Sequence, residues 1–191
     1  MTGSVAVDRA AAVRAALRTL VAQRGFHGAS MSAVAAEADV AVGTAYVHYE
    51  SKDELVFATY LETKRELGDA GIAAVDATAA ASDRFVQLWL GIYRFLAVRP
   101  DHARFLLQME SSPYAQVVHG RALASPGDPI AVETAKPDLA ELLTPLPFEV
   151  LYDLGLGPAV RLAASGRTLD DDSLALVAAG SWRAITAAAG R

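Results

Sequence analysis

The sequence has no cysteine, few aromatic residues and no long uninterrupted apolar run. Without cysteine the chain forms no disulfide and no thiolate-bound metal site, which suits a reducing cytoplasm. The longest apolar run, FVQLWLGIYRFLAV at residues 85–98, contains Gln87 and Arg94 and is too short to span a bilayer. The first ten residues lack the basic stretch and apolar run of a signal peptide. We therefore expect a soluble cytoplasmic protein with no membrane partner.

Basic residues are also in short supply. The 17 lysines and arginines are outnumbered by 22 acidic residues, and the formal net charge of −5 excludes a uniformly basic nucleic-acid binder. A local basic face is still compatible with this balance. Hydrophobic residues make up 53% of the 191 positions, so the chain can bury a substantial core. The length fits one large domain, or a small domain joined to a larger one.

The sequence also lacks the usual signatures of enzymes and cofactor sites. It contains no G-x-S-x-G, no phosphate-binding loop, no G-x-G-x-x-G and no H-E-x-x-H. Its four histidines are scattered, and a metal site from His102, Glu110 and His119 is the weaker alternative to no site at all. The run at residues 170–172 is interpreted as acidic compensation of a helix dipole, with a metal site as its alternative. We expect no enzyme activity and no cofactor.

What the sequence does have is helical periodicity and helix-end signals. Apolar residues recur at three and four positions, Ser30 is a candidate N-cap, and Ser51 with Glu54 forms a capping-box pattern. No segment alternates with period two for long. The prediction is an all-α fold whose first four helices cover about Asp8 to Arg24 (ended by Gly25), Ser30 to near Asp39, Val42 to Tyr49, and Ser51 onward, with Gly68 and Gly71 weakening the far end of the fourth.

The order of these helices is informative. A helix followed by two short helices across a tight turn is the layout of a helix-turn-helix module. The second short helix of such a module enters the DNA major groove, so its outward side chains need no core to cover them. This interpretation explains why Tyr46, His48 and Tyr49 crowd one short segment without an apolar face.

Residues 9–55 resemble the DNA-binding domain of the tetracycline-repressor (TetR) family. The residues that carry the resemblance are Gly25-Phe26, Ser30, Val34-Ala35, Ala38, Val40, Gly43-Thr44, Tyr46, His48-Tyr49, Ser51-Lys52 and Glu54-Leu55. The resemblance implies a homodimeric transcription regulator, usually a repressor, that binds a double-stranded DNA operator. It also implies a helical C-terminal domain that binds a small ligand and dimerises. The expected domains are residues 1–55 for DNA binding and residues 56–191 for ligand binding and dimerisation.

Three positions depart from the family pattern. Asp39 stands where the tight turn usually has glycine, although aspartate tolerates a left-handed conformation better than most residues. Ala41 replaces the usual serine cap of the recognition helix, and Val42 replaces a residue that is often basic. Residues 1–55 carry five basic and six acidic side chains, a net charge of −1, so phosphate attraction should be modest.

The candidate DNA contacts combine helix-start polar groups, a close backbone approach and outward rings. Each has a structural alternative: capping for Ser30, helix initiation for Gly43, and a packed ring for Tyr46. Tyr49 is interpreted as a core residue with its hydroxyl at the edge, and Phe26 as core. The predicted DNA-binding residues are Ser30, Ser32, Val42, Gly43, Thr44, Tyr46, His48 and Lys52.

The second half predicts a helix at about residues 85–99, a helix capped by Asp101, a proline-broken segment that forms loops or a lid, and two final helices. The first of these runs from about Pro147 with a kink at Pro158, and the second starts at residues 170–172. These two suit a two-fold four-helix interface, with an ordinary intramolecular bundle as the alternative. A small apolar or aromatic effector is expected among inward aromatic side chains, for which plain core packing is the alternative: Phe85, Trp89, Tyr93, Phe105, Met109 and Tyr152.

Two functions stay open on these observations. The first is a ligand-responsive transcriptional regulator, a homodimeric repressor released from its operator by the effector. The second is a helical small-molecule-binding or adaptor protein whose helix-turn-helix no longer reads DNA, which Val42 and the −1 charge of the module favour.

Overall fold

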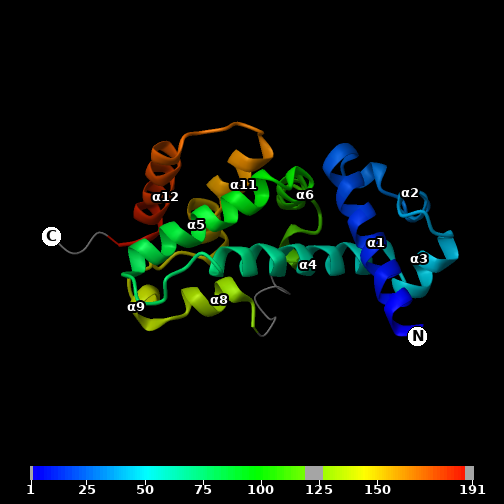
Figure 1. Ribbon diagram of the computed structural model, residues 1–191, viewed down its shortest axis with the longest axis horizontal. Helices are drawn as coiled ribbons and strands as arrows, with labels where there is room; N and C mark the ends of the chain where they lie inside the picture. The colour runs from blue at the N-terminus through cyan, green and yellow to red at the C-terminus, as the bar shows by residue number, and fades with distance from the viewer. Residues whose placement is uncertain (1, 119–126, 188–191) are drawn as a thin grey trace. The chain divides into compact units, whose positions relative to one another are not determined.

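The computed structural model describes residues 2–118 and 127–187, and they form an all-α fold (Figure 1). The helices, in chain order, are α1 Thr2–Arg24, the 3-10 helix η1 Phe26–Gly28, α2 Met31–Glu37, α3 Val42–His48, α4 Lys52–Ile72, α5 Ala81–Ala97, α6 Pro100–Glu110, α8 Pro129–Thr134, α9 Pro137–Ala140, α10 Phe148–Gly155, α11 Gly157–Ala164 and α12 Asp171–Ile185. In the described ranges the β structure is limited to one isolated bridge between Leu143 and Thr186. The predicted fold class is confirmed.

The chain divides into two compact units. Unit 1 is Met1–Thr63 with Asp101–Val118, and unit 2 is Lys64–Pro100 with His119–Arg191. Helix α4 contributes to both units. The domain boundary expected after residue 55 stays a prediction.

Local signals placed the end of α1 and the bounds of α2 and α3, but α1 begins at Thr2, six residues before the start expected near Asp8. Helix α1 buries Val13, Leu17 and Val21 completely, and it ends at Gly25, whose φ of 68° favours glycine. The Ser30 hydroxyl accepts a hydrogen bond from the Ala33 amide at 3.2 Å and caps α2. These signals act over three or four residues, which is why the sequence alone located them.

The turn between α2 and α3 depends on Asp39. Its φ of 53° makes it the one non-glycine residue with positive φ in the described part of the chain. An aspartate adopts this left-handed conformation more readily than most side chains. The helix-turn-helix geometry is therefore kept without the usual glycine.

A capping box starts α4, with one difference from the predicted pattern. The Ser51 hydroxyl accepts from the Glu54 amide at 3.1 Å, as expected. The Glu54 carboxylate accepts in return from the amide of Glu50 at 2.6 Å, one residue before the cap. Both bonds fix the start of α4 immediately after the end of α3.

Helix α4 continues past Gly68 and Gly71 and ends at Ile72, one residue after the second glycine. A Cβ on Gly71 would lie 2.7 Å from Leu88 and 2.9 Å from Ile92 of α5. A Cβ on Gly68 would lie 3.2 Å from Pro129 of α8. These glycines let neighbouring elements of unit 2 approach α4 closely, so packing compensates for their low helix propensity.

The remaining helices of unit 2 build its core around α5, which packs against α11 and α12. The predicted helix from Pro147 is two helices, α10 and α11, that meet at Leu156, because Pro158 stands in the first turn of α11. Helix α12 starts as predicted, with the Asp170 carboxylate accepting from the Ser173 amide at 2.7 Å. This bond lowers the pKa of Asp170.

Asp101 was predicted to cap α6, and this prediction was wrong. The helix begins one residue earlier, at Pro100, where the fixed φ of proline suits a first helical position. Asp101 lies in the first turn, and its carboxylate accepts a hydrogen bond from the Thr19 hydroxyl of α1 at 3.0 Å. The acidic side chain thus joins α6 to α1 within unit 1.

Candidate nucleic-acid interface and candidate ligand site

Helix α3 carries five of the eight predicted DNA contacts, and three of these five lie on its exposed face. Val42 and Tyr46 lie one turn apart and are 40% and 50% exposed, while Ala45 on the opposite face is fully buried. Gly43 is exposed on the same outward side, and a methyl group placed on it would meet no atom within 4 Å. Thr44 and His48 flank this face and are half-buried, and Ser30 and Ser32 are exposed at the start of α2.

Val47 is an outward residue that the sequence interpretation missed. It is 82% exposed, the most exposed large apolar side chain of the described residues. Its position four residues after Gly43 was the available signal, because such a pair shares one helix face. Val42, Gly43, Tyr46 and Val47 together form what we name the outward face of α3.

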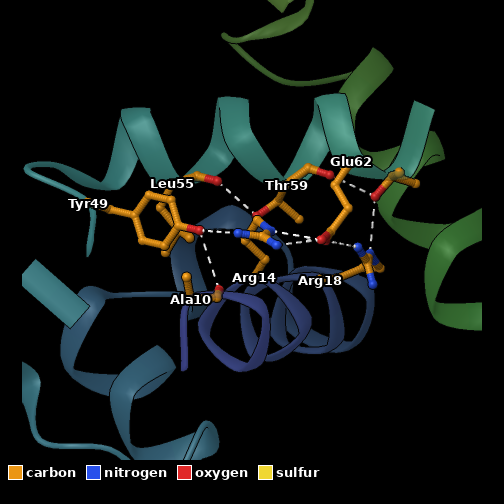
Figure 2. Close-up of polar contacts among 8 residues, drawn as sticks. Ala10, Arg14, Arg18, Tyr49, Leu55, Thr59 and Glu62 are labelled. Carbon is orange, nitrogen blue, oxygen red and sulfur yellow. Dashed lines mark hydrogen bonds and ion pairs between the residues drawn. The ribbon is translucent and has the colours of Figure 1, made fainter. Parts of the chain in front are cut away.

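Tyr49 lies inside unit 1, as predicted, and takes part in a charged network between α1 and α4 (Figure 2). Arg14 donates to the Tyr49 hydroxyl at 2.6 Å and to Glu62 Oε1 from both Nε and Nη2, at 2.9 and 2.6 Å. Arg18 donates to Glu62 Oε2 at 2.7 Å and to the buried Thr63 hydroxyl at 3.1 Å. The hydrogen bonds to Glu62 raise the pKa of Arg14 above its ordinary high value. The network fixes the end of α3 against α1 and α4.

Lys52 was predicted to contact a phosphate, and the structure gives its amine a second role. Nζ donates to the backbone carbonyl of Phe26 at 2.5 Å. The bond satisfies a carbonyl of η1, which lies between α1 and α2. Phe26 itself is half-buried, and its ring packs 5.2 Å from Tyr114 and 6.4 Å from Phe105, measured between centroids.

The Tyr114 ring completes this aromatic cluster of unit 1. It meets Phe57 edge-on at 6.2 Å, and its hydroxyl donates to Asp53 Oδ1 at 2.8 Å. Burial of the ring, followed by the bond to the Asp53 carboxylate, raises the pKa of Tyr114 to about 12. The neutral phenol is therefore the form that stabilises the fold.

We expect this tyrosine to make unit 1 sensitive to alkaline pH. The folded-state pKa of about 12 lies above the ordinary value of about 10, so the contribution of Tyr114 is intact below pH ~10 and is lost as pH rises through ~12. Urea unfolding between about pH 9 and pH 12 should show a smaller loss of stability for Tyr114→Phe, which cannot ionise, than for the wild type. Equal losses in the two proteins would contradict the assignment.

The six predicted ligand residues are divided between the two units. Phe105 and Met109 belong to unit 1, and both are fully buried. The other four belong to unit 2, where Trp89 stacks on Tyr93 at 5.9 Å with an interplanar angle of 15°. Phe85 and Tyr152 are the other two predicted ligand residues of unit 2.

Charged side chains also lie inside unit 2, which the sequence interpretation did not foresee. Lys64 is 6% exposed, and its amine lies 5.3 Å from the centre of the Tyr152 ring. Arg84 is 4% exposed, and its Nε donates to Glu133 Oε1 at 2.9 Å. No signal within a few residues reveals the latter pair, because its members are 49 positions apart.

From the sequence we expect neither a membrane-spanning segment nor a metal site. Among these residues, no helix has the length and apolar character needed to cross a membrane. In the same residues, no three or more His, Asp or Glu side chains gather as a metal site would require. His119, one member of the alternative metal set, lies outside the described residues.

Two family models match the chain. Residues 13–59 match bacterial regulatory proteins of the tetR family, and residues 81–186 match the tetracyclin repressor-like C-terminal domain. A curated relative, an uncharacterized HTH-type transcriptional regulator of Haemophilus influenzae, is 30% identical over 189 residues, which cover 93% of this chain and 96% of that protein.

Solved structures agree with the family match. A TetR-family transcriptional regulator from Haemophilus influenzae has a TM-score of 0.76 at 28% identity and covers 95% of this chain and 98% of its own. Regulators from Marinobacter aquaeolei (TM-score 0.78, 21% identity, 96% and 98% coverage) and Shewanella sp. (0.78, 24%, 94% and 99%) share the fold. The matched proteins are regulators of transcription and not enzymes. The chain therefore belongs to the TetR family of bacterial regulatory proteins and is a DNA-binding regulator of transcription.

Proposed function

We propose that this regulator is a cytoplasmic homodimer that represses transcription and leaves its operator when a small apolar or aromatic molecule binds its helical C-terminal domain. Residues 1–55 would form the DNA-binding domain, and residues 56–191 the ligand-binding and dimerisation domain. The observation that carries the DNA-binding part is the outward face of α3, whose apolar and aromatic side chains are exposed on a helix that is otherwise packed.

The side chains of this face match the chemistry of a major groove. The Tyr46 hydroxyl suits a phosphate contact, and the methyl groups of Val42 and Val47 suit the methyl group of thymine. Ser30, Ser32, Thr44, His48 and Lys52 surround the face as further contacts to the DNA backbone. Two such helices in a dimer would reach successive major grooves, roughly 34–36 Å apart.

Most basic side chains of residues 1–55 already have protein partners. Arg14 and Arg18 bind Glu62, and the Lys52 amine binds a carbonyl. Arg9 and Arg24 are exposed. Each phosphate neutralised contributes about −0.9 to the slope of log affinity against log salt concentration. We therefore expect a shallow salt dependence for operator binding.

A mobility-shift assay with the promoter region beside its own gene tests the proposal, and Tyr46→Phe tests the role of α3. We expect Tyr46→Phe to weaken binding about five- to tenfold, and by a similar factor across operator variants, because a phosphate contact positions the protein without reading bases. Val47→Ala is the matched control on the same face and should change the preference for thymine instead. The opposite pattern would reverse these roles, and a wild-type protein that shifts no DNA would favour the adaptor alternative.

Exposed apolar side chains on the last helices support the dimer. Phe148, Val150 and Leu154 of α10 are each 39% exposed, and Leu176 of α12 is 70% exposed. Contiguous exposed apolar surface on a soluble protein commonly marks an interaction site. A symmetric pair of such faces would bury each other as a four-helix interface.

We expect Leu176→Arg to give a monomer in light scattering at micromolar concentration, where the wild type gives a dimer. The change places two like charges against each other across the two-fold axis and removes apolar contact area. Val132→Arg, at a 58% exposed position of α8, is the matched control and should stay dimeric. A monomeric wild type, or a dimeric Leu176→Arg, would contradict the proposed interface.

The effector would act through α4, which begins at the end of the DNA-binding module and continues into unit 2. A ligand changes operator affinity only if it binds one dimer geometry more tightly than the other. Its proposed site is lined by Phe85, Trp89, Tyr93 and Tyr152 of unit 2, whereas the other two residues predicted from the sequence, Phe105 and Met109, belong to unit 1.

A further inference from the structure

Trp89 carries a buried hydrogen-bond donor, its indole N–H, that has no acceptor among the described residues. The side chain is 0% exposed, and within the described residues its Nε1 has no hydrogen-bond partner. A buried indole N–H normally meets an acceptor, because leaving the donor unpaired forfeits its hydration. An apolar ring would fill similar space without that loss. An unpaired donor of this kind therefore requires a specific explanation.

The donor lies in the middle of the aromatic stripe of α5. Phe85, Trp89 and Tyr93 are spaced by four residues, so they share one face of the helix. Tyr93 stacks on Trp89, and its hydroxyl donates a hydrogen bond to the Arg167 carbonyl at 3.4 Å. Phe85 packs 5.4 Å from the ring of Trp182. Among the side chains of this stripe, the Trp89 N–H is the polar group left unpaired.

We propose that the effector is an aromatic or apolar molecule that carries a neutral hydrogen-bond acceptor, such as a carbonyl or ether oxygen, and that the Trp89 indole N–H donates to it. The inference rests on the proposed ligand site on α5. A neutral acceptor fits better than a carboxylate, because one N–H cannot compensate the dehydration of a full negative charge. Both arginines of α5 already lie near carboxylates: Arg84 lies against Glu133 and Asp138, and the exposed Arg94 lies 3.8 Å from Asp171.

Full burial of Trp89 also links this hydrogen bond to the proposed release of the operator by the effector. Side chains cover the indole completely in this conformation, so a ligand reaches its N–H edge only by displacing some of them. The ligand thereby favours a rearranged packing of unit 2 over the one described here. A preference of this kind is what a change in operator affinity requires.

Two matched pairs of probes test the proposal on the full-length chain: acetophenone with ethylbenzene, and fluorenone with fluorene. The members of each pair have similar shape, and the first member adds a carbonyl oxygen. We expect the ketones to bind about five- to tenfold more tightly to the wild type, and this preference to fall below about twofold in Trp89→Phe. The ketones should also shift the ¹⁵N–¹H indole resonance of Trp89, which Trp182→Phe assigns because the chain has two tryptophans.

Any of three results would overturn the proposal. The first is equal affinity of the wild type for both members of each pair, and the second is a ketone preference that survives in Trp89→Phe. The third is a Trp89 indole resonance that stays unchanged up to millimolar ketone. If Trp89→Phe does not fold, the wild-type affinities and resonance decide alone. Mobility shifts on the same samples separate the two levels. If the hydrocarbons release the operator as readily as the ketones, the proposed function stands, but the proposal that the effector needs a hydrogen-bond acceptor is wrong. If the protein prefers the ketones but binds no operator, the hydrogen bond from Trp89 stands and the proposed function is wrong.

Discussion

Replacing Glu133 by alanine should lower the free energy of unfolding by about 3 kcal/mol, which is the effect expected when one partner of a buried ion pair is removed. Glu133 is 5% exposed and Arg84 is 4% exposed, and the two lie 2.9 Å apart between α8 and α5 of unit 2. Without Glu133 the guanidinium stays buried against one carboxylate, that of Asp138, and the carbonyl of Ala79. Bonds to Asp138 and Glu133 raise the pKa of Arg84, so deprotonation offers no relief.

Urea unfolding at fixed protein concentration measures this effect. Asp138→Asn is the matched control, because the Asp138 side chain is 56% exposed and lies 2.8 Å from the same guanidinium. Solvent screens an exposed partner, so the control should cost less than about 1 kcal/mol. The double change Arg84→Met with Glu133→Leu should cost less than Glu133→Ala alone, since it leaves no buried charge unpaired. A control as damaging as Glu133→Ala would mean that Asp138, and not Glu133, neutralises Arg84.

This pair also marks the limit of what the sequence could predict. Apart from the start of α1, the ends of the helices in the DNA-binding module were predictable because their determinants are local. Ser30 and Ser51 cap helices through amides three residues later, and Asp39 sets its turn through its own φ. Arg84 and Glu133 are 49 residues apart, and only the packing of α8 on α5 makes a charged residue an interior one.

Glycine positions show the same division. Gly25 ends a helix because of its own backbone conformation, which a sequence pattern reveals. Gly71 is buried within a helix because Leu88 and Ile92 approach it, and Gly91 because the Ala70 carbonyl would lie 3.0 Å from its Cβ. Helix propensity, a local quantity, therefore does not report the packing that requires glycine at residues 71 and 91.

The candidate sites were predictable to different extents. The outward face of α3 follows from helical spacing, and the sequence supplied Val42, Gly43 and Tyr46, although Val47 was missed. The partners of the basic residues did not follow, because the bonds from Arg14 to Glu62 and from Lys52 to Phe26 cross between helices. Aromatic periodicity found the stripe on α5, but periodicity does not report whether an indole N–H has an acceptor.

Gly43→Ala should weaken operator binding by at least about tenfold while raising the stability of the free protein slightly. A methyl group on Gly43 would meet no atom of the protein within 4 Å, so the fold itself does not require glycine there. Alanine is the better helix former by up to about 1 kcal/mol, which makes glycine in α3 unfavourable unless another molecule approaches the backbone closely. Under the proposed function that molecule is DNA against the outward face of α3, and an added methyl group would hold the backbone away from it.

Gly71→Ala is the control with the opposite signature. The same methyl group would lie 2.7 Å from Leu88, so overpacking should lower stability by about 1–3 kcal/mol. Well below its unfolding temperature this variant should still bind the operator with nearly wild-type affinity, because Gly71 belongs to unit 2. Fluorescence anisotropy with a labelled operator and thermal unfolding monitored by circular dichroism give both quantities for each variant. If Gly43→Ala bound the operator as tightly as the wild type, the backbone at residue 43 would not approach DNA, and the contact would have to come from the side chains of Tyr46 and Val47 alone.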